Sequence, residues 1–506
     1  MLKICNHKYH LAGLPYFYRF TSQAYLQMKF SRFFLLIISV FVIKTFAAAQ
    51  SDSEHYKIIA DTTFKDSVPS NLFIASISIY GNKKTKSFVI NREIPFKQGD
   101  YITPEQLAKD LVLAKQQLIN TSLFLDVSVY VENRYGQYVF ITVFVKERWY
   151  IFPLPYFKYI DPNFNTWWVT YNHSLKRTNY GIKFLHNNIS GRNDKFTTWL
   201  ITGYSKQVAV KYERPYFDKR LQNGYSMYLS YSDQRELNYG TDLSKQQYFR
   251  PDSLFSVRKA IKAEVNYIYR PGLRFRHIFK LGYMREDIAD TIFALNKNYF
   301  ANGKTKESFP YFGYTLRYSD ADYNIYPTKG FLSEASILHR GFSAGMNLTQ
   351  LQVISTYTLP VLPKTQIQFK EGAIINLPFK QPFYNKNMFG YGGIFMHGYE
   401  YYVVDGNVGV VGRATLQHQI FSITKTVGQD AKKQMDIPFR FFAKVYGDAG
   451  YAYDKNPGNS VLNNKLLHSW GLGIDMVTAY DLVFKFEYSF NQLGGSGLFL
   501  HIATDF

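Results

Sequence analysis

Cysteine is almost missing from this sequence: Cys5 is the only one in 506 residues. A single thiol cannot form an internal disulfide, so the fold is held without such bonds. Long apolar runs are missing too, because no stretch reaches the roughly 18 residues that indicate a transmembrane helix. Charged residues are sparse at 19%, but hydrophobic residues reach 46%, which argues against a disordered chain.

Aromatic side chains are plentiful, with 43 Tyr and 44 Phe in an aromatic content of 18%. A water-facing globular surface rarely carries so many rings. Membrane barrels place aromatic rings in two girdles at the membrane–water interfaces. A barrel in a membrane would therefore account for the excess.

The segment FFLLIISVFVI, residues 33–43, follows the basic stretch MKFSR and precedes the small residues of KTFAAAQ. A basic start, a short apolar core and a small-residue cleavage site are typical of a secretory signal peptide. We predict a signal peptide at 28–49, cleaved after Ala49, and assign residues 1–27 to an upstream extension. The alternative, a membrane anchor, requires a longer apolar segment. Residues 50–71 are polar and rich in turn formers, which predicts a tether.

The chain is basic, with a formal net charge of +21. Six basic residues and no acidic ones lie in positions 1–50, so the exported part carries +15. Nucleic acid binding would account for such a charge, but the Lys and Arg residues are scattered and form no compact basic helix. Contact with anionic lipid headgroups or surface sugars is an equally good explanation.

Residues 72–148 combine three strand patterns with two helix patterns. Alternation in LFIASISIYGN, DVSVYVEN and YVFITVFVKER predicts the strands. Helical spacing in KTKSFVINREI and TPEQLAKDLVLAKQQLINTSLF predicts the helices, the second of which begins with Thr103 as N-cap and Pro104 in its first turn. The order β-α-α-β-β predicts one small α+β domain with its helices on one face of the sheet. Another α+β fold of this size is the alternative.

Helical spacing disappears after residue 149, and segments of about ten residues alternate in polarity. In LVFKFEYSF, for example, Phe484 and Phe486 share one face, whereas Lys485 and Glu487 share the other. We count sixteen such segments and predict a mainly β fold, in which a 16-stranded antiparallel transmembrane β-barrel occupies residues 149–506. Closure follows because an open sheet edge in lipid would leave backbone groups unpaired. A soluble array of β-sandwiches is the alternative, but it explains neither the rings nor the signal peptide.

Several local motifs resemble those of a known family. ISIYGN, LINTSLF and VKER make residues 72–148 similar to a POTRA domain. In the barrel region, VAVKYERPYFD resembles the family's fourth strand, YNIYPTKGF its Pro-Thr-x-Gly turn, GYGGIFMHGYE its sixth surface loop and VYGDAGYAY its Asp-x-Gly strand. Residues 72–506 thus resemble the bacterial surface antigen superfamily, whose members include BamA, TamA and the two-partner secretion transporters. The resemblance implies an outer-membrane barrel with one POTRA domain in the periplasm.

The resemblance also implies that the Gly-rich loop 378–408 folds back into the barrel, where its tip docks on the inner wall. Family members usually carry Val-Arg-Gly-Tyr at the tip. The corresponding residues here are Met396, His397, Gly398 and Tyr399.

The family's Arg pairs with two acidic wall residues, which correspond here to Gln417 and Asp448. Arg has become His397 and one Glu has become Gln417, so one charge of each sign is lost and the balance is kept. We hypothesise that His397 binds Asp448 with help from Gln417, in a contact that is weaker and pH-sensitive. The alternative is that His397 faces solvent and the loop is merely long.

By resemblance, the protein is an outer-membrane insertase or translocase that uses no nucleotide. Its POTRA domain would capture an unfolded client by strand addition, which places a capture edge at Val127, Val129 and Val131. The client would then pair with a seam between the first and last barrel strands, predicted at 167–173 and 497–506. The predicted seam residues are Trp167, Trp168, Gly497 and Phe506.

The expected partners are client proteins, outer-membrane lipids and lipopolysaccharide, with accessory lipoproteins or periplasmic chaperones as further candidates. No nucleic acid, cofactor or metal is expected. A passive outer-membrane channel or surface barrel is the main alternative, in which charged residues such as Lys211 and Glu213 simply line a pore. An outer-membrane enzyme such as a phospholipase is the last alternative, although no zinc-protease motif, P-loop or Cys-based site indicates one.

Overall fold

The computed structural model describes residues 70–159, 172–251, 255–427 and 435–503. The predicted upstream extension, the signal peptide and residues 50–69 of the tether lie outside these ranges. So do three of the predicted seam residues, Trp167, Trp168 and Phe506.

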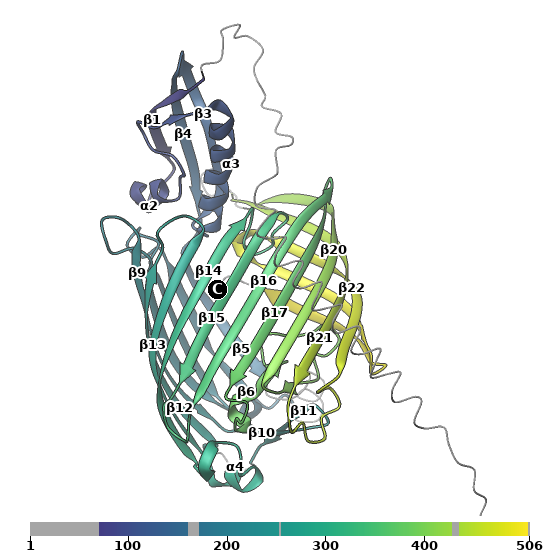
Figure 1. The fold of residues 1–506 in the computed structure, drawn as a ribbon. Helices are drawn as coiled ribbons and strands as arrows, with labels where there is room; N and C mark the ends of the chain where they lie inside the picture. The colour runs from purple at the N-terminus through teal and green to yellow at the C-terminus, as the bar shows by residue number, and fades with distance from the viewer. Residues whose placement is uncertain (1–69, 160–171, 252–254, 428–434, 504–506) are drawn as a thin grey trace, which may run out of the picture. The chain divides into compact units, whose positions relative to one another are not determined.

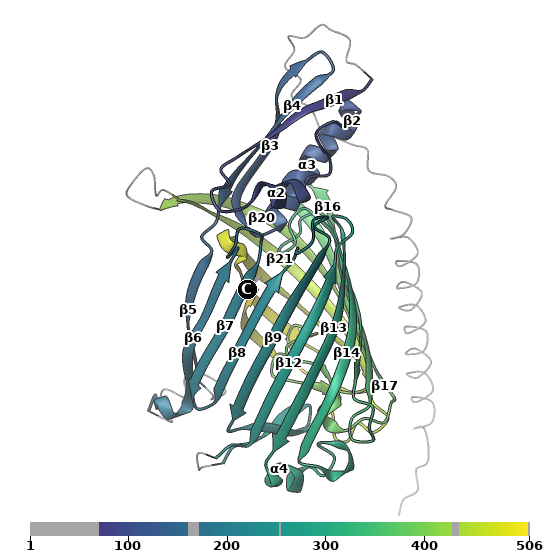
Figure 2. The ribbon, with the colours of Figure 1, turned by 90° about the vertical axis from the view of Figure 1, so that its left-hand side faces the viewer.

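The first described domain is a small sheet packed against two helices (Figures 1 and 2). β4 pairs in parallel with β1 and antiparallel with β3, which gives the strand order β2-β1-β4-β3. The predicted β-α-α-β-β order is confirmed, with the two-residue β2 as an addition. The elements are β1 (Leu72–Tyr80), α2 (Ser87–Arg92), β2 (Tyr101–Ile102), α3 (Pro104–Asn120), β3 (Phe124–Tyr135) and β4 (Tyr138–Glu147).

α3 shows how local sequence sets this packing. The Thr103 side chain accepts a hydrogen bond from the Gln106 amide at 3.2 Å and caps the helix. Pro104 follows at a position where a missing amide hydrogen costs nothing. The helical face that packs against the sheet is apolar and buried, and it includes Leu107, Ala114 and Leu118.

The rest of the described chain is dominated by one 16-stranded sheet. Every neighbouring pair in it is antiparallel, and the sheet curls into a barrel with β5 and β24 at the two ends of the strand order (Figures 1 and 2). Both the barrel and its strand number were predicted and are confirmed. The strands are β5 (Ile151–Tyr159), β6 (Thr178–Asn187), β7 (Lys195–Gly203), β8 (Lys206–Arg214), β9 (Asn223–Gln234), β12 (Arg258–Tyr269), β13 (Phe275–Ile288), β14 (Lys306–Ala321), β15 (Gly330–Arg340), β16 (Leu348–Leu362), β17 (Thr365–Leu377), β20 (Val408–Val427), β21 (Met435–Tyr453), β22 (Leu466–Thr478), β23 (Val483–Asn491) and β24 (Ser496–Ala503).

The two faces of the barrel strands differ in polarity, as the alternation predicted. On β22, Trp470, Leu472 and Ile474 point outward and are 58%, 53% and 48% exposed. The alternate residues point inward, and Ser469 and Asp475, which flank this run, are both buried. An apolar outer face and a polar interior are the arrangement that a barrel in lipid requires.

One barrel strand was missed. We placed the first barrel strand at 167–173, of which residues 167–171 lie outside the described ranges, but the sheet already begins before that range with β5. β5 contains Pro153 and Pro155, and prolines usually argue against a strand because they cannot donate to a ladder. They are tolerated here because β5 lies at the end of the sheet. The other fifteen segments counted from the sequence correspond to the remaining fifteen strands of the sheet.

Three of the connections carry strands or an α-helix of their own. β10 (Leu237–Asp242) and β11 (Lys245–Phe249) form a hairpin between β9 and β12, and α4 (Asp290–Leu295) follows β13. The short pair β18 (Asn387–Phe389) and β19 (Val404–Asp405) lies between β17 and β20. Among the described residues, no helix is long and apolar enough to span a membrane.

Candidate functional site

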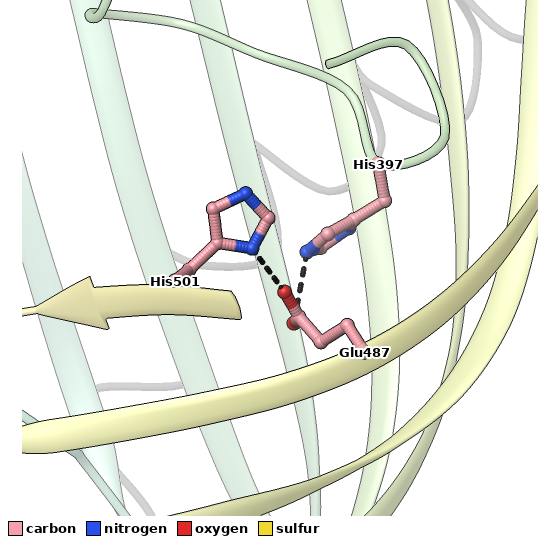
Figure 3. A group of neighbouring side chains, drawn as sticks. All are labelled: His397, Glu487 and His501. Atoms are coloured by element: carbon pink, nitrogen blue, oxygen red, sulfur yellow. Dashed lines mark hydrogen bonds and ion pairs between the residues drawn. The ribbon is translucent and has the colours of Figure 1, made fainter. Parts of the chain in front are cut away.

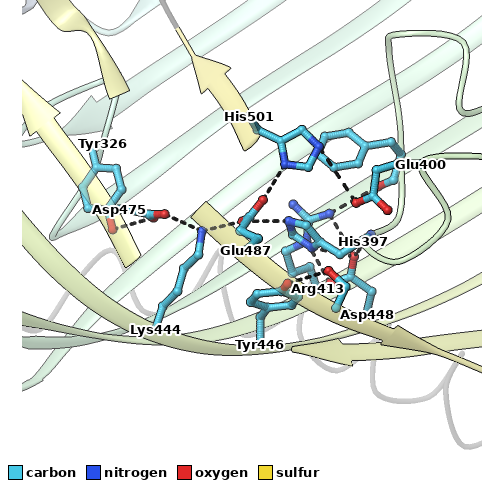
Figure 4. A network of polar contacts seen from close by, with 12 residues as sticks. Tyr326, His397, Glu400, Arg413, Lys444, Tyr446, Asp448, Asp475, Glu487 and His501 are labelled. Carbon is cyan, nitrogen blue, oxygen red and sulfur yellow. Dashed lines mark hydrogen bonds and ion pairs between the residues drawn. The ribbon is translucent and has the colours of Figure 1, made fainter. Parts of the chain in front are cut away.

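The connection between β17 and β20 turns into the barrel, and its tip lies against the inner wall (Figure 4). Met396, His397 and Tyr399 at the tip are only 3%, 4% and 6% exposed. These residues are buried although they lie far along a long connection, because the wall strands β21 to β23 contact them directly. We call this group of contacts the loop-tip site.

His397 lies between two carboxylates. Its main-chain amide and its Nδ1 atom contact Asp448 Oδ2 on β21 at 2.9 and 3.1 Å. Its Nε2 atom lies 3.0 Å from Glu487 Oε1 on β23. Both carboxylate side chains are fully buried. The structure therefore places His397 against Asp448, the partner proposed from the sequence, and adds Glu487 as a second one.

Arg413 on β20 supplies the guanidinium that the loop tip itself lacks. Its Nε and Nη2 atoms donate to the two oxygens of Asp448, each at 2.9 Å. Nη2 also donates to the main-chain oxygen of Phe395 at 3.3 Å, and the guanidinium lies 5.0 Å from the centre of that ring. Sequence reasoning missed Arg413. The available signal was its position directly opposite Asp448 in the β20–β21 register.

A second charged chain continues from Glu487 along the wall (Figure 4). Lys444 Nζ contacts Glu487 Oε1 at 2.5 Å and Asp475 Oδ1 at 2.6 Å. His501 Nδ1 on β24 lies 2.5 Å from Glu487 Oε2. Because Glu487 contacts both His397 and His501, the loop tip is linked to the last strand of the barrel. Metal-binding atoms of His397, Glu487 and His501 come within 4.8 Å of one another.

Gly398 and Tyr399 hold the tip by main-chain contacts. The Asn491 side chain donates to the Gly398 oxygen at 2.6 Å, and the Tyr399 hydroxyl donates to the His468 oxygen at 3.0 Å. Gly398 has a φ of +80°, a conformation that other residues adopt only with strain. A Cβ atom there would also approach the Phe490 oxygen to 3.3 Å.

Gln417 was assigned to the loop-tip site, but its contact lies elsewhere. It accepts a hydrogen bond from Gln366 at 3.2 Å, and no hydrogen bond joins it to His397 within the described part of the chain. The two residues line the same interior cavity of about 400 Å³ without touching. The predicted assistance of Gln417 is therefore wrong; Arg413 and Glu487 take that place.

Wall glycines make room for the loop. A Cβ atom on Gly450 would come within 2.5 Å of Met396 Sδ. A Cβ atom on Gly372 would come within 3.1 Å of the Ile394 side chain, and one on Gly409 within 2.9 Å of the Phe389 ring. The loop thus packs directly on main chain, which explains why glycine occupies inward positions of three different strands.

The remaining predicted residues lie apart from this site. Gly497 is on β24, at the end of the sheet. Val127, Val129 and Val131 are on β3, the edge strand of the small domain, but their side chains pack on its core. A partner at this edge would therefore meet the β3 backbone rather than these side chains.

The sequence GFSAG, residues 341–345, matches the G-x-S-x-G pattern of the nucleophile elbow in serine hydrolases. A nucleophile elbow requires a strand followed by a helix. This segment instead joins the antiparallel strands β15 and β16, and Ser343 accepts a hydrogen bond from the Met346 amide. It is therefore a turn between two barrel strands.

Comparison with known proteins identifies the small domain. The family described as "Surface antigen variable number repeat" matches residues 72–148. These residues are a POTRA domain. No curated protein sequence matches the chain.

Two solved structures resemble this chain in fold. CdiB from Escherichia coli is 10% identical, with a TM-score of 0.53 over 86% of this chain and 76% of that one. BamA from Haemophilus ducreyi lacking POTRA domains 1–3 is 15% identical, with a TM-score of 0.48 over 85% and 84% of the chains. The chain thus consists of one POTRA domain followed by a 16-stranded barrel, and its fold is similar to that of CdiB.

The POTRA domain is joined to the turns of the barrel by buried ion pairs. At the end of α2, Glu93 receives two bonds from Arg270 at 2.5 and 2.7 Å and one from Tyr216 at 2.9 Å. At the end of β4, Arg148 donates two bonds to Asp481 at 2.6 and 3.0 Å. Burial alone would raise the pKa of Glu93, but Arg270 outweighs it, with help from Arg92, and holds that pKa below its ordinary value.

We expect acid to loosen this junction. Because the pKa of Glu93 is lowered in the folded protein, its stabilisation is present above the ordinary carboxyl pKa and is lost as pH falls through the lowered one. The protection of the α2 segment against hydrogen exchange, measured relative to the intrinsic amide rate at each pH, should therefore be constant between pH 7 and about pH 5 and fall below about pH 4. Glu93→Gln should exchange quickly at every pH, because it leaves a buried Arg270 unpaired.

The control is Glu105→Gln, which removes an exposed ion pair with Lys109 on α3. It should leave both the exchange rate and its pH dependence unchanged. A wild-type junction whose protection relative to the intrinsic amide rate is equal at pH 3 and pH 7 would refute the role of Glu93.

Proposed function

We propose that this protein inserts client proteins into the outer membrane or exports them through it, without nucleotide or covalent chemistry. Clients would be handled by main-chain pairing at two exposed strand edges, one in the POTRA domain and one in the barrel. The fold shared with CdiB from Escherichia coli supports this proposal. Because the two chains are only 10% identical, the edges of this chain have to carry the rest of the argument.

The first edge is β3. It lies at the end of the POTRA sheet and is paired only with β4 among the described strands. An extended client can add to such an edge by main-chain hydrogen bonds, which require no particular client sequence. Tyr130 points away from the core and is 47% exposed, so it would lie beside an added strand.

The second edge, on β5, carries the proposal. The Asn187 amide on β6 donates to the Tyr150 oxygen at 2.7 Å, so the backbone of residue 150 faces β6. Directions alternate along a strand, and hence residues 153 and 155 face away from β6, toward the seam. Both are prolines without an amide hydrogen. Two donors are therefore missing from the edge that β24 would have to pair with.

A seam that lacks these donors would form fewer main-chain hydrogen bonds than a strand pair of the same length without proline. Separating it costs fewer hydrogen bonds, which matters in lipid because water cannot replace them. An incoming client strand would meet an edge whose pairing is incomplete. The expected consequence is a barrel that opens at β5 and β24 in preference to elsewhere.

Capture at β3 is tested by crosslinking in cells. A photo-reactive residue at position 130 should capture unfolded outer-membrane or exported proteins, identified by mass spectrometry, whereas the same residue at Lys115 on α3 should not. A side chain at position 130 would lie within reach of an added strand, whereas α3 offers no free main-chain edge. Equal yields from the two positions, or no client at position 130, would contradict capture by strand addition.

A further inference from the structure

We propose that His397, Glu487 and His501 form a binding site for a divalent transition-metal ion such as zinc inside the barrel (Figure 3). The site is independent of the proposed transport function. It would join three separate elements: the loop tip, β23 and the last strand β24.

The donor set suits such an ion. Two imidazole nitrogens and a carboxylate are frequent zinc ligands, with bonds of about 2.0–2.2 Å. Tetrahedral ligand atoms at these bond lengths lie ~3.3 Å apart. Glu487 Oε1 is 3.0 Å from His397 Nε2, and Glu487 Oε2 is 2.5 Å from His501 Nδ1. All ligand atoms lie within 4.8 Å of one another, so small shifts of the Glu487 side chain would admit an ion.

The neighbours of His397 determine which of its two ring nitrogens would bind the metal ion. Asp448 Oδ2 lies 3.1 Å from Nδ1, and a carboxylate held by Arg413 can only accept, so Nδ1 carries a hydrogen. Nε2 then faces Glu487 either with a second proton or with a lone pair directed at a cation. A ligand His that donates its other nitrogen to a carboxylate is the usual outer arrangement of metal sites.

Neighbouring charges are compatible with an ion. Lys444 contacts Glu487, but it is also paired with Asp475 and keeps that partner if Glu487 turns toward a metal. Glu400 of the loop approaches His501 Nε2 only to 3.9 Å, and neither of its carboxylate oxygens makes a hydrogen bond in the described structure. An under-bonded carboxylate beside two His side chains favours a cation nearby.

His501 gives the ion a route of entry. Its side chain is 29% exposed, whereas those of His397 and Glu487 are 5% and 0% exposed. A bound ion would hold the loop tip against β24, the strand at the end of the sheet. Metal occupancy would thereby oppose both withdrawal of the loop and movement of the last strand.

The test uses the full chain in detergent micelles, stripped with a chelator and titrated with zinc by calorimetry. Wild type should bind one zinc per chain, and the zinc X-ray absorption spectrum should show two imidazole ligands. His501→Asn and Glu487→Gln should each weaken binding by at least the 10- to 100-fold that losing an outer hydrogen-bond partner costs. His418→Asn, which changes an exposed His on β20, should bind as wild type does.

A wild-type protein that binds no stoichiometric zinc would overturn the proposal and leave a doubly protonated His397 between Asp448 and Glu487. Unchanged binding by His501→Asn would overturn it too. That variant removes a side chain of intermediate exposure, so it separates ligand loss from misfolding if Glu487→Gln does not fold.

Discussion

Replacing Asp448 with Asn should release the loop tip from the barrel interior. The Asp448 side chain is fully buried and holds both Arg413 and His397. Asn keeps the shape but removes the charge, which leaves a largely buried guanidinium without its partner. The loop itself loses two hydrogen bonds to a charged carboxylate, from the His397 amide and from its Nδ1 atom, which contribute about 1.5–3 kcal/mol each. Each 1.4 kcal/mol is tenfold, so the loop-out state should become roughly 100-fold or more populated.

Two measurements report this release. Hydrogen exchange of residues 394–400 should accelerate by about the same factor in Asp448→Asn. Single-channel conductance in planar bilayers should be small for wild type and rise in the variant, because the loop no longer fills part of the interior. A large ohmic pore in wild type with the loop intact would instead favour a passive channel.

Glu334→Gln is the matched control for Asp448→Asn. Glu334 also pairs with an Arg on a neighbouring strand, Arg317, but those side chains are 42% and 50% exposed. Exposed pairs contribute about 0–1 kcal/mol, so loop exchange and conductance should stay at the wild-type level. If both variants behaved like wild type, the loop would be held by packing alone and the role of Asp448 would be refuted.

The barrel and the POTRA domain could be predicted from the sequence because the spacing of polar and apolar residues differs between strands and helices. Polarity that alternates every residue, as in LVFKFEYSF, allows only a strand with two different environments. Thr103 and Pro104 likewise place the start of α3. The first barrel strand was missed because its prolines contradict the usual ladder, and only its place at the sheet edge makes them acceptable.

The loop-tip site could be predicted only in part. Resemblance aligned His397 with Asp448, since both lie in recognisable motifs. Arg413, Glu487 and His501 follow from which residues face each other across registers, and single-residue shifts in register reverse those faces. Gln417 was wrongly assigned to the site. The family has an acidic residue at this position that pairs with the loop tip, whereas Gln417 is uncharged and bonds to Gln366 instead.

The seam should be the one strand pair whose separation the protein needs. If clients leave through it, a covalent bond between β5 and β24 should stop delivery, even though the POTRA domain can still capture them. A bond between two strands that stay paired should have no effect. The loss of client delivery should be large, because an incoming strand cannot displace two strands that are joined by a disulfide.

The seam is tested in a Cys5→Ser background with Phe157→Cys on β5, combined in turn with Gly497→Cys, Leu498→Cys and Phe499→Cys on β24. The control pair is Tyr488→Cys with Leu498→Cys, which lie directly opposite each other on β23 and β24. Clients captured at position 130 are then followed into the outer membrane. The account predicts that the oxidised β5–β24 pair blocks their arrival until reductant is added, while the control pair does not. Undiminished delivery through a fully oxidised β5–β24 pair would contradict it.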